Sequence, residues 1–432
     1  MIPLIKCPIC ENEKWISLDH LREQRQWFAS DLRHFEESIG FKVCEFCGFI
    51  TYDYLEYDRL KYNYTIQRPS VQIGNIVTGN KKLEYHANFL KDIDFKNFTV
   101  LDYGCAVGLF LNYLHEEKSV PRENLYGIEM VDSLRNFAKY EYKVNVSEKL
   151  SNRSFDFICL YHTLEHLQYP DLVLKNCCEQ LNQSGFLYIS VPIWLDKMEN
   201  DAGDDPQTFE MLYHVNHVNC FTYKSLHNLL RKSGFEIIKK DIEMYGYTIL
   251  CKKTKKDDTI EIEDSKYIVA EIEKQKKAFE LFQQKKFEEA LTLYPRFANC
   301  YIHWSVWQDN MRNFDKQLEI LNKGLEILPN NLTLLAQKAR LYFQWDENNK
   351  EKQNFYSGNI RIAEKLIKDI LEKKPGFDDF WFFLSMIELK YKKDYDKAVE
   401  YMRRSIKINP SKIREGLELI GKMWDAKGLI SK

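Results

Sequence analysis

The stretch 100-VLDYGCAVGLF-110 decides the fold of the middle of the chain. It begins with apolar residues that suit a buried strand, and it continues with an acid and a Gly-x-x-x-Gly spacing. Gly104 and Gly108 lack a Cβ, so the backbone at these positions can approach a ligand closely. The helix expected next, 109-LFLNYLHEE-117, presents free N–H groups at its start. The stretch therefore predicts a strand, a ligand-binding turn and a helix.

The residues around this turn favour a nucleoside over a phosphate. A phosphate-binding loop has a Lys followed by Ser or Thr, or a GxGxxG spacing, and this turn has neither. Asp102 at the strand end would repel a phosphate and suits a cation. A second apolar stretch, 124-NLYGIEM-130, contains Glu129 near its end. A carboxylate at that position can accept hydrogen bonds from both hydroxyls of a ribose.

Strand and helix patterns alternate over the middle of the chain. We expect strands at 99–103, 124–130, 155–161, 185–191, 235–243 and 247–253. Helical patterns cover 171–181 and 222–235, the second with Thr222 as N-cap and Gly234 just past its end. Alternation of this kind predicts a parallel sheet with helices on its faces. The last two strands are close in sequence and should form an antiparallel hairpin.

The motif VLDYGCAVG followed by GIE resembles the class I S-adenosylmethionine-dependent methyltransferases, over about residues 80–253. The resemblance implies an α/β Rossmann-like core with a seven-stranded, mostly parallel sheet and an antiparallel last strand. It implies that Asp102 orients the turn and the methionine amino group, that Glu129 binds ribose and that Met130 packs on adenine. The implied cofactor site comprises Asp102, Gly104, Cys105, Gly108, Glu129, Met130, Tyr161 and His162.

A second phrase, 156-DFICLYHTLEHLQYPDLVL-174, matches a pattern hhLEHhxxP that the family often has over the cofactor. His162, Glu165 and His166 lie within one turn of each other. We expect them to shape the pocket and cap a helix, with His166 also a candidate catalytic residue. A metal triad of these three residues is the alternative, although their spacing does not match a known three-ligand motif.

Composition excludes several classes of protein. The 432 residues include 62 basic and 64 acidic ones, a formal charge of -2, which gives no support to a nucleic-acid partner. No run of about 18 apolar residues predicts a membrane span, and the N-terminus MIPLIKCPIC does not have the pattern of a secretory signal. With 11 cysteines and no export signal, thiols or metal ligands are expected rather than disulfides, and we expect the cytoplasm as compartment.

Four cysteines near the N-terminus form two CxxC pairs, Cys7 with Cys10 and Cys44 with Cys47, separated by 33 residues. Each pair can present two thiolates to one tetrahedral ion. We therefore predict a structural Zn²⁺ with no open coordination position. Two independent redox or unliganded pairs are the alternative.

The order of segments carries a more specific resemblance. A four-cysteine module, then the Tyr-rich 61-KYNYTIQRPS-70, then the methyltransferase core is similar to bacterial methyltransferases of deoxysugar and glycan pathways. The resemblance implies a sugar substrate, either nucleotide-linked or part of a surface glycan, faced by Tyr62 and Tyr64. Ordinary aromatic packing of these tyrosines is the alternative.

The candidate base lies in 210-EMLYHVNHVNCFTYKSL-226. The sugar C-methyltransferases have a phrase EHxxYF here with a catalytic His, and His217 matches it. Asn216 replaces the Glu and Cys220 replaces the Tyr, so an oxygen acceptor is as plausible as a carbon one. His214, three residues earlier, is a second candidate, and packing or capping histidines are the alternative.

The last part of the chain carries a repeat. Pro295, Pro329, Pro375 and Pro410 each follow an amphipathic stretch, at spacings of 34, 46 and 35 residues. This resembles tetratricopeptide repeats, in which small residues such as Ala290, Ala363 and Ala398 lie between the helices, although Gln317 departs from the pattern. A generic helical bundle is the alternative. Such arrays bind a partner, here a second protein or another copy of this chain.

These patterns divide the chain into a zinc module at 1–70, a methyltransferase domain at 71–255 and helical repeats at 265–432. The function they favour is methyl transfer from S-adenosylmethionine to an oxygen or carbon of a sugar. The alternatives are a protein or peptide methyltransferase that docks its substrate on the repeats, and a binding protein with a decayed core.

Overall fold

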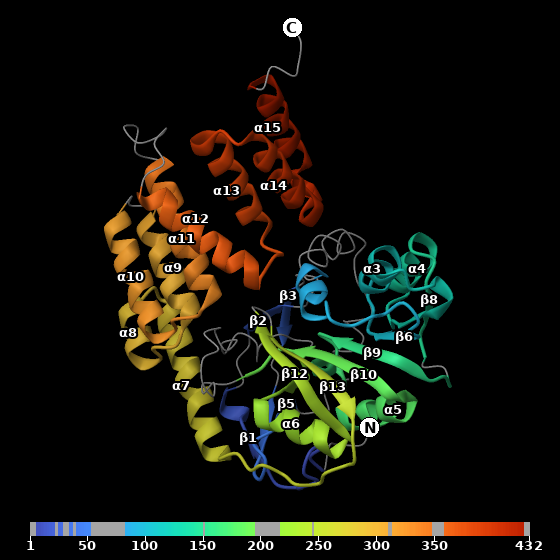
Figure 1. The fold of residues 1–432 in the computed structure, drawn as a ribbon. Coiled ribbons are helices and arrows are strands. Elements are labelled where there is room, and N and C mark those ends of the chain that lie inside the picture. The colour runs from blue at the N-terminus through green and yellow to red at the C-terminus, as the bar shows by residue number, and fades with distance from the viewer. Residues whose placement is uncertain are drawn as a thin grey trace. The chain divides into compact units, whose positions relative to one another are not determined.

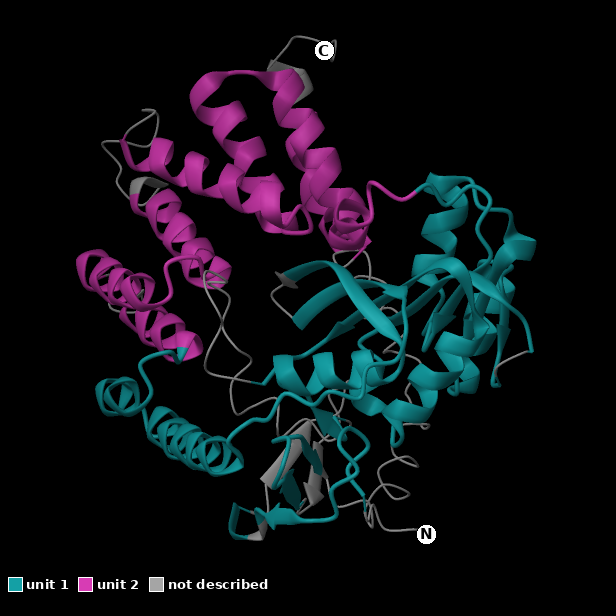
Figure 2. Ribbon diagram, turned by 60° about the horizontal axis from the view of Figure 1, so that its bottom comes forward, with its two compact units in different colours: residues 1–72, 94–297 teal, residues 73–93, 298–432 magenta. Residues whose placement is uncertain are grey.

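The computed structural model describes residues 6–21, 25–28, 34–37, 40–52, 83–149, 152–194, 217–243, 246–309, 313–347 and 358–426. The chain divides into two compact units (Figure 2). Unit 1 comprises residues 1–72 and 94–297, and unit 2 comprises residues 73–93 and 298–432. The first two helices after residue 264 thus group with unit 1, and a short segment before the first strand of the large sheet groups with unit 2.

Unit 1 contains a seven-stranded mixed sheet in the order β12-β13-β10-β9-β6-β7-β8 (Figure 1). Its strands are β6 (Val100–Tyr103), β7 (Leu125–Ile128), β8 (Asn145–Ser147), β9 (Phe155–Tyr161), β10 (Leu181–Val191), β12 (Phe235–Glu243) and β13 (Gly246–Lys253). The neighbouring strands from β10 through β9, β6 and β7 to β8 are parallel, whereas β13 is antiparallel to both β10 and β12. The predicted sheet and its antiparallel last strand are confirmed, with β13 lying inside the edge strand β12.

Helices cover both faces of this sheet, α3 and α4 above it and α5 and α6 below it in the view of Figure 1. They are α3 (Leu109–Lys118), α4 (Asp132–Glu141), α5 (Pro170–Gln180) and α6 (Tyr223–Lys232). Helix α6 begins as predicted, because Thr222 and Ser225 form a capping box in which each side chain accepts a hydrogen bond from the other residue's backbone N–H. Gly234 follows the end of α6 with a φ of 85°, a conformation that glycine adopts without strain.

A second, four-stranded sheet in the order β1-β4-β5-β11 joins the cysteine-rich segment to the core. Strands β1 (Trp15–Ser17), β4 (Phe41–Cys44) and β5 (Ile50–Tyr52) come from that segment, but β11 (Asn219–Cys220) comes from the chain just before α6. Phe49 packs against Phe221 with ring centroids 5.7 Å apart. Cys7, Ile9 and Phe49 accordingly share one hydrophobic core with the large sheet. The pair β2 (Arg25–Phe28) and β3 (His34–Glu37) forms a separate hairpin.

Helices α7 (Ser265–Gln283) and α8 (Phe287–Leu293) complete unit 1. The start of α7 packs on the second cysteine knuckle, where the Ser265 hydroxyl donates to the Glu45 carbonyl at 3.0 Å. Further along, the Trp194 indole N–H donates to the Gln275 side-chain carbonyl at 3.1 Å. Residues 254–264, which lead into α7, have no regular secondary structure.

Unit 2 is helical in its described parts. Its helices are α9 (Ala298–Asp309), α10 (Phe314–Ile327), α11 (Leu332–Glu347), α12 (Gly358–Lys373), α13 (Asp378–Ile387), the π-helical η6 (Glu388–Lys392), α14 (Tyr395–Ile408) and α15 (Ile413–Ala426). Consecutive helices pack in pairs, α9 on α10, α11 on α12 and α13 on α14. None of the helices in the described ranges is long and apolar enough to cross a membrane.

The repeated prolines mark the ends of helices, as predicted. Each lies two residues past the last residue of a helix, after α8, α10, α12 and α14. Ala290, Ala363 and Ala398 are fully buried, and Gln317 is 5% exposed. The helical character of this part of the chain is confirmed, whereas its assignment to tetratricopeptide repeats stays a prediction.

Candidate functional site

The turn after β6 has the backbone conformation that its glycines permit. Gly104 has a φ of 80°, and its N–H donates to the Ile128 carbonyl of β7 at 2.8 Å. A Cβ at Gly104 would lie 2.6 Å from the Thr163 hydroxyl oxygen, so a larger residue does not fit. Gly108 precedes α3 with a φ of 79°. The turn therefore lies close to the end of β9 and presents the start of α3 at the carboxyl edge of the sheet.

Glu129 links this turn to the end of β7. Its Oε2 accepts the Ala106 N–H at 3.0 Å, and its Oε1 accepts the Val131 N–H at 2.7 Å. The side chain is buried, and burial raises the pKa of its carboxyl while those backbone donors lower it. Met130, the next residue in the chain, is 41% exposed. A ribose at Glu129 would therefore have to share the carboxylate with backbone donors that already hold it in place.

Asp102 is buried at the end of β6, next to Cys159 of β9 across the parallel pair. Burial, opposed by a hydrogen bond with Cys159 and assisted by the nearby Glu129 carboxylate, raises the pKa of the Asp102 carboxyl to about 7. Asp102 is therefore poised to ionise near neutral pH, and an ammonium group beside it would favour the charged form.

Cys105 follows Gly104 and turns its thiol toward the sheet. A Cβ at Gly127 would lie 2.6 Å from the Cys105 Sγ, so the turn can pack this closely on β7 only because residue 127 is glycine. Burial raises the pKa of the Cys105 thiol well above its ordinary value. The thiol packs against Gly127 at the base of the turn, and its part in the cofactor site stays a prediction.

The end of β9 forms the other wall of the site. Tyr161 ends the strand, and the rings of Tyr161 and His162 contact edge to face with centroids 4.5 Å apart. His162 has a φ of 48°, a left-handed backbone that is strained for a non-glycine residue. The Thr163 hydroxyl donates to the Tyr103 carbonyl at 2.9 Å and so holds this segment against the turn. Sequence reasoning missed Thr163, whose only signal is a small polar residue directly after the motif's first His.

Glu165, His166 and His217 come together next to the end of β9. Glu165 and His166 belong to the short 3-10 helix η4 (Leu164–His166), and His217 lies just before β11. One ligand atom from each lies within 4.8 Å of the others. The His166 and His217 ring centroids are 5.0 Å apart, and the His166 Nε2 is 3.9 Å from the Glu165 Oε1. The structure thus brings two of the predicted catalytic histidines together with a buried carboxylate.

His217 is held by a network that sequence reasoning did not identify. Strand β11 pairs antiparallel with β5, with Asn219 opposite Thr51. The Thr51 hydroxyl donates to the Val218 carbonyl at 3.1 Å, and the Asn219 side-chain amide donates to the Leu167 carbonyl at 2.6 Å. Asn219 therefore ties the strand after His217 to the loop that carries Glu165 and His166. The sequence signal was weak, a single Asn within the apolar stretch 218–221.

The remaining predicted site residues cannot be placed. His214, Tyr62 and Tyr64, as well as Asn216, lie outside the described residues.

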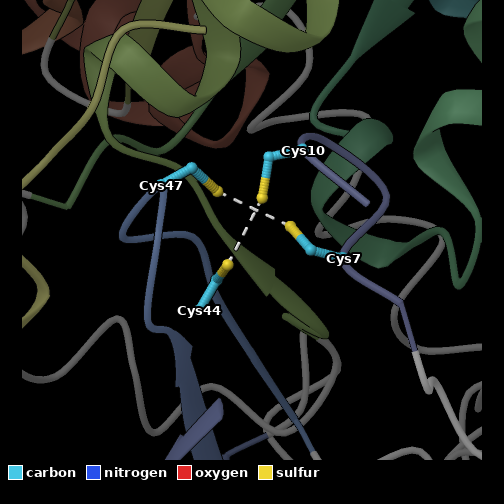
Figure 3. A group of neighbouring side chains, drawn as sticks. All are labelled: Cys7, Cys10, Cys44 and Cys47. Atoms are coloured by element: carbon cyan, nitrogen blue, oxygen red, sulfur yellow. Dashed lines mark hydrogen bonds between the residues drawn. The ribbon is translucent and has the colours of Figure 1, made fainter. Parts of the chain in front are cut away.

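The four cysteines form a compact cluster (Figure 3). Their Sγ atoms all lie within 4.8 Å of one another, with Cys7 to Cys47 and Cys10 to Cys44 both at 3.5 Å. Tetrahedral coordination at a Zn–S distance of about 2.3 Å places sulfurs about 3.8 Å apart. The cluster therefore has the size that a tetrahedral thiolate site requires.

The two knuckles have the same backbone geometry. The N–H of the residue after each pair donates to the carbonyl of its first cysteine, Glu11 to Cys7 at 2.9 Å and Gly48 to Cys44 at 3.1 Å. Both residues have a positive φ, 62° and 72°. Two unrelated CxxC segments that adopt the same turn and face each other fit a shared ion better than two independent redox pairs.

Comparison with known proteins agrees with this geometry. Residues 80–240 match the family model described as a methyltransferase domain, which is less than half of the chain. The chain therefore carries an S-adenosylmethionine-dependent methyltransferase domain. No curated protein sequence matches the chain significantly.

Several solved structures are distantly similar to the chain. The pyocyanin biosynthetic protein PhzM has 16% identity and a TM-score of 0.33, covering 40% of this chain and 55% of its own. An S-adenosylmethionine-dependent methyltransferase from Thermotoga maritima has 16% identity and a TM-score of 0.33, covering 43% and 96%. An O-methyltransferase from a Brevibacillus brevis trans-AT polyketide synthase, solved with S-adenosylhomocysteine, has 12% identity and a TM-score of 0.32, covering 40% and 72%. The chain thus spans about half the length of PhzM.

Replacing Glu129 with Ala should weaken S-adenosylhomocysteine binding at least tenfold, about 1.4 kcal/mol, because the ribose loses its carboxylate and the turn loses an acceptor. Calorimetric titration measures the affinity. Glu141→Ala, which removes an exposed carboxylate at the end of α4, is the control and should bind normally. A folded Glu129→Ala protein with unchanged affinity would contradict the assignment.

Binding of S-adenosylhomocysteine should strengthen as pH rises through 7. We expect Asp102 to pair with the methionine ammonium, and a carboxyl whose pKa is about 7 is largely neutral at pH 6 and ionised at pH 8. The apparent affinity should therefore rise about tenfold between these pH values. Asp102→Asn should bind more weakly and show no such rise. Parallel pH profiles for the two proteins would exclude Asp102 as the titrating group.

Proposed function

We propose that this protein transfers the methyl group of S-adenosylmethionine to an oxygen or carbon of a sugar, either nucleotide-linked or a component of a surface glycan. The observation that carries the proposal is the pairing of β5 with β11, which places the cysteine-rich module beside His217. That arrangement supports the resemblance to sugar methyltransferases, in which such a module folds over the sugar. Tyr62 and Tyr64 are the proposed substrate contacts.

His217 is the proposed base. It is buried, within 4.8 Å of the Glu165 carboxylate, which would stabilise the imidazolium formed when it takes a proton. In the reaction, His217 removes a proton from the acceptor atom, and that atom forms a bond to the methyl carbon. The methyl–sulfur bond breaks, and its electron pair stays on sulfur to give S-adenosylhomocysteine. His166 and His214 are the further candidates for proton transfer.

We further propose that Cys7, Cys10, Cys44 and Cys47 hold a structural Zn²⁺. The equal knuckle geometry and the sulfur spacing support this ion. Four thiolates fill the coordination shell, so the zinc would supply folding energy and no chemistry. Its position would fix β4 and β5, and through β5 the strand that follows His217.

The helical repeats are proposed to bind a partner protein or a second copy of this chain. The paired helices of unit 2 support an array of this kind. In this proposal they recruit the enzyme to its site of action and take no part in the methyl transfer.

The purified full chain should contain about one zinc per molecule, because four thiolates coordinate one ion. Cys44→Ser should lose it and melt at a lower temperature, because the module then lacks its crosslink. Cys178→Ser, which removes a half-buried cysteine of α5, should keep both the zinc and the melting temperature. Elemental analysis with thermal unfolding tests this, and a zinc-free wild-type protein of normal stability would refute it.

Incubation of the full chain with labelled S-adenosylmethionine should methylate a nucleotide-linked deoxysugar and not a panel of peptides. His217→Ala should lower kcat by about 100-fold or more, as expected for loss of a general base. His115→Ala is the control, because His115 contacts only the Val120 carbonyl among the hydrogen bonds described and lies at the end of α3. Peptide methylation without sugar methylation would favour the protein methyltransferase instead.

A further inference from the structure

We propose that Glu165, His166 and His217 form a second metal site, which binds one divalent cation next to the cofactor turn and holds the substrate hydroxyl on it. The site is separate from the four cysteines. It rests on the proposed function only for the identity of the acceptor, because cation binding can be measured without any substrate.

The geometry of the three side chains is close to that of a coordinated group. Their ligand atoms lie within 4.8 Å of one another, whereas ligands at about 2.1 Å from one ion lie about 3.0–3.5 Å apart. Small side-chain rotations close this difference. The His166 and His217 rings are tilted by 57° with centroids at 5.0 Å, so two nitrogens can face one point without stacking.

The carboxylate of the group is buried deeply enough to require a charged partner. The Glu165 side chain is 1% exposed, and the imidazoles of His162 and His166 approach its Oε1 at 3.3 and 3.9 Å. An ionised carboxylate at such depth is stable only when it is paired or bound to a metal. His162 can hold this oxygen from outside the ligand group, as carboxylate and imidazole partners do around metal ions.

The backbone positions of the ligands are fixed by other contacts. The Asn219 amide donates to the Leu167 carbonyl at 2.6 Å and approaches the Leu164 carbonyl at 3.4 Å, on both sides of Glu165 and His166. The Thr51 hydroxyl holds the Val218 carbonyl next to His217. One asparagine thus spans the two segments that supply the ligands, which keeps the ligand set assembled without an ion.

The donor set indicates which cation fits. Two imidazoles and one carboxylate favour first-row ions such as Mn²⁺, Fe²⁺, Co²⁺ or Zn²⁺ over Mg²⁺ or Ca²⁺, which prefer oxygen ligands. Three protein ligands leave coordination positions open for water or substrate, in contrast to the closed set of four cysteines. The site is therefore of the catalytic type.

Its place in the sheet suits methyl transfer. Thr163 lies two residues before Glu165 and packs against the cofactor turn. Its hydroxyl donates to the Tyr103 carbonyl and lies so close to Gly104 that a Cβ there would clash with it. A hydroxyl bound to the cation would lose its proton to solvent water, because the metal lowers its pKa. The oxygen then bonds to the methyl carbon while the methyl–sulfur bond breaks and leaves its electron pair on sulfur. A His217 nitrogen bound to the cation cannot also accept the proton, so in this proposal the cation replaces His217 as the group that promotes ionisation of the acceptor hydroxyl.

The test uses the full chain holding one zinc per molecule, the ion of the four cysteines, titrated with Mn²⁺ and followed by electron paramagnetic resonance. Mn²⁺ is the weakest binder of the first-row series, so it does not displace zinc from thiolates. We expect one Mn²⁺ per chain, with affinity at least tenfold weaker in His217→Ala and in Glu165→Gln. His20→Ala is the matched control, because it removes an exposed His–Glu pair, His20 with Glu273 at 2.7 Å, and should bind Mn²⁺ normally.

Two further measurements keep the outcomes distinct. S-adenosylhomocysteine titration shows that each variant is folded, and elemental analysis shows that its zinc is retained. With an accepted sugar, kcat/KM should rise at least tenfold when Mn²⁺ is added after dialysis against metal-free buffer. No Mn²⁺ bound by the folded wild type, or binding that both site variants leave unchanged, overturns the metal site. Mn²⁺ binding lost in both variants supports it even where no sugar is methylated, an outcome that rejects only the proposed substrate.

Discussion

The antiparallel pairing of β5 with β11 is the constraint on which the candidate site depends. It joins a strand of the cysteine-rich module to a strand that begins two residues after His217. The Thr51 hydroxyl adds a hydrogen bond to the Val218 carbonyl next to His217, and the Asn219 amide connects β11 to the segment that carries Glu165 and His166. The module is therefore part of the wall of the site. Any change that loosens the cysteine knuckles acts on the position of His217 through two short strands.

Buried carboxylates give the carboxyl edge of the sheet its chemistry. Asp102, Glu129 and Glu165 are each 5% exposed or less. Glu129 is satisfied by two backbone N–H groups, whereas burial and the charge of Glu129 keep the pKa of Asp102 near 7. Each carboxylate needs a donor or a cation when it is charged. A ribose, a methionine ammonium and a divalent ion are the partners that we propose for Glu129, Asp102 and Glu165 respectively.

The helical unit is stabilised by a different pattern of contacts. Small buried alanines allow paired helices to approach, and buried charges are matched within the unit. Lys392 lies 2.5 Å from Glu364 and 3.2 Å from Glu388. Arg404 pairs with Glu84 at 2.6 Å, so the described residues 83–93 belong with the helices of unit 2. The chain thus passes from one unit to the other three times, and unit 2 cannot be defined as a simple C-terminal piece.

The amino-acid sequence alone determined the features that depend on local pattern. Hydrophobic runs and glycine spacing predicted the large sheet and its turn, Thr222 and Gly234 predicted the limits of α6, and the prolines predicted the ends of four helices. The four cysteines were also predicted as one group, because two CxxC pairs in a chain without an export signal favour a shared metal ion over disulfides. Only the tertiary structure decided that β11 joins the module's sheet, that α7 packs on the second knuckle, and that His217 meets Glu165 and His166. These contacts join residues more than 50 or 160 positions apart, such as Asn219 with Leu167 and Thr51 with Val218. Periodicity and motif spacing report on neighbours along the chain, so they could not reveal that the third member of the group lies in a separate segment.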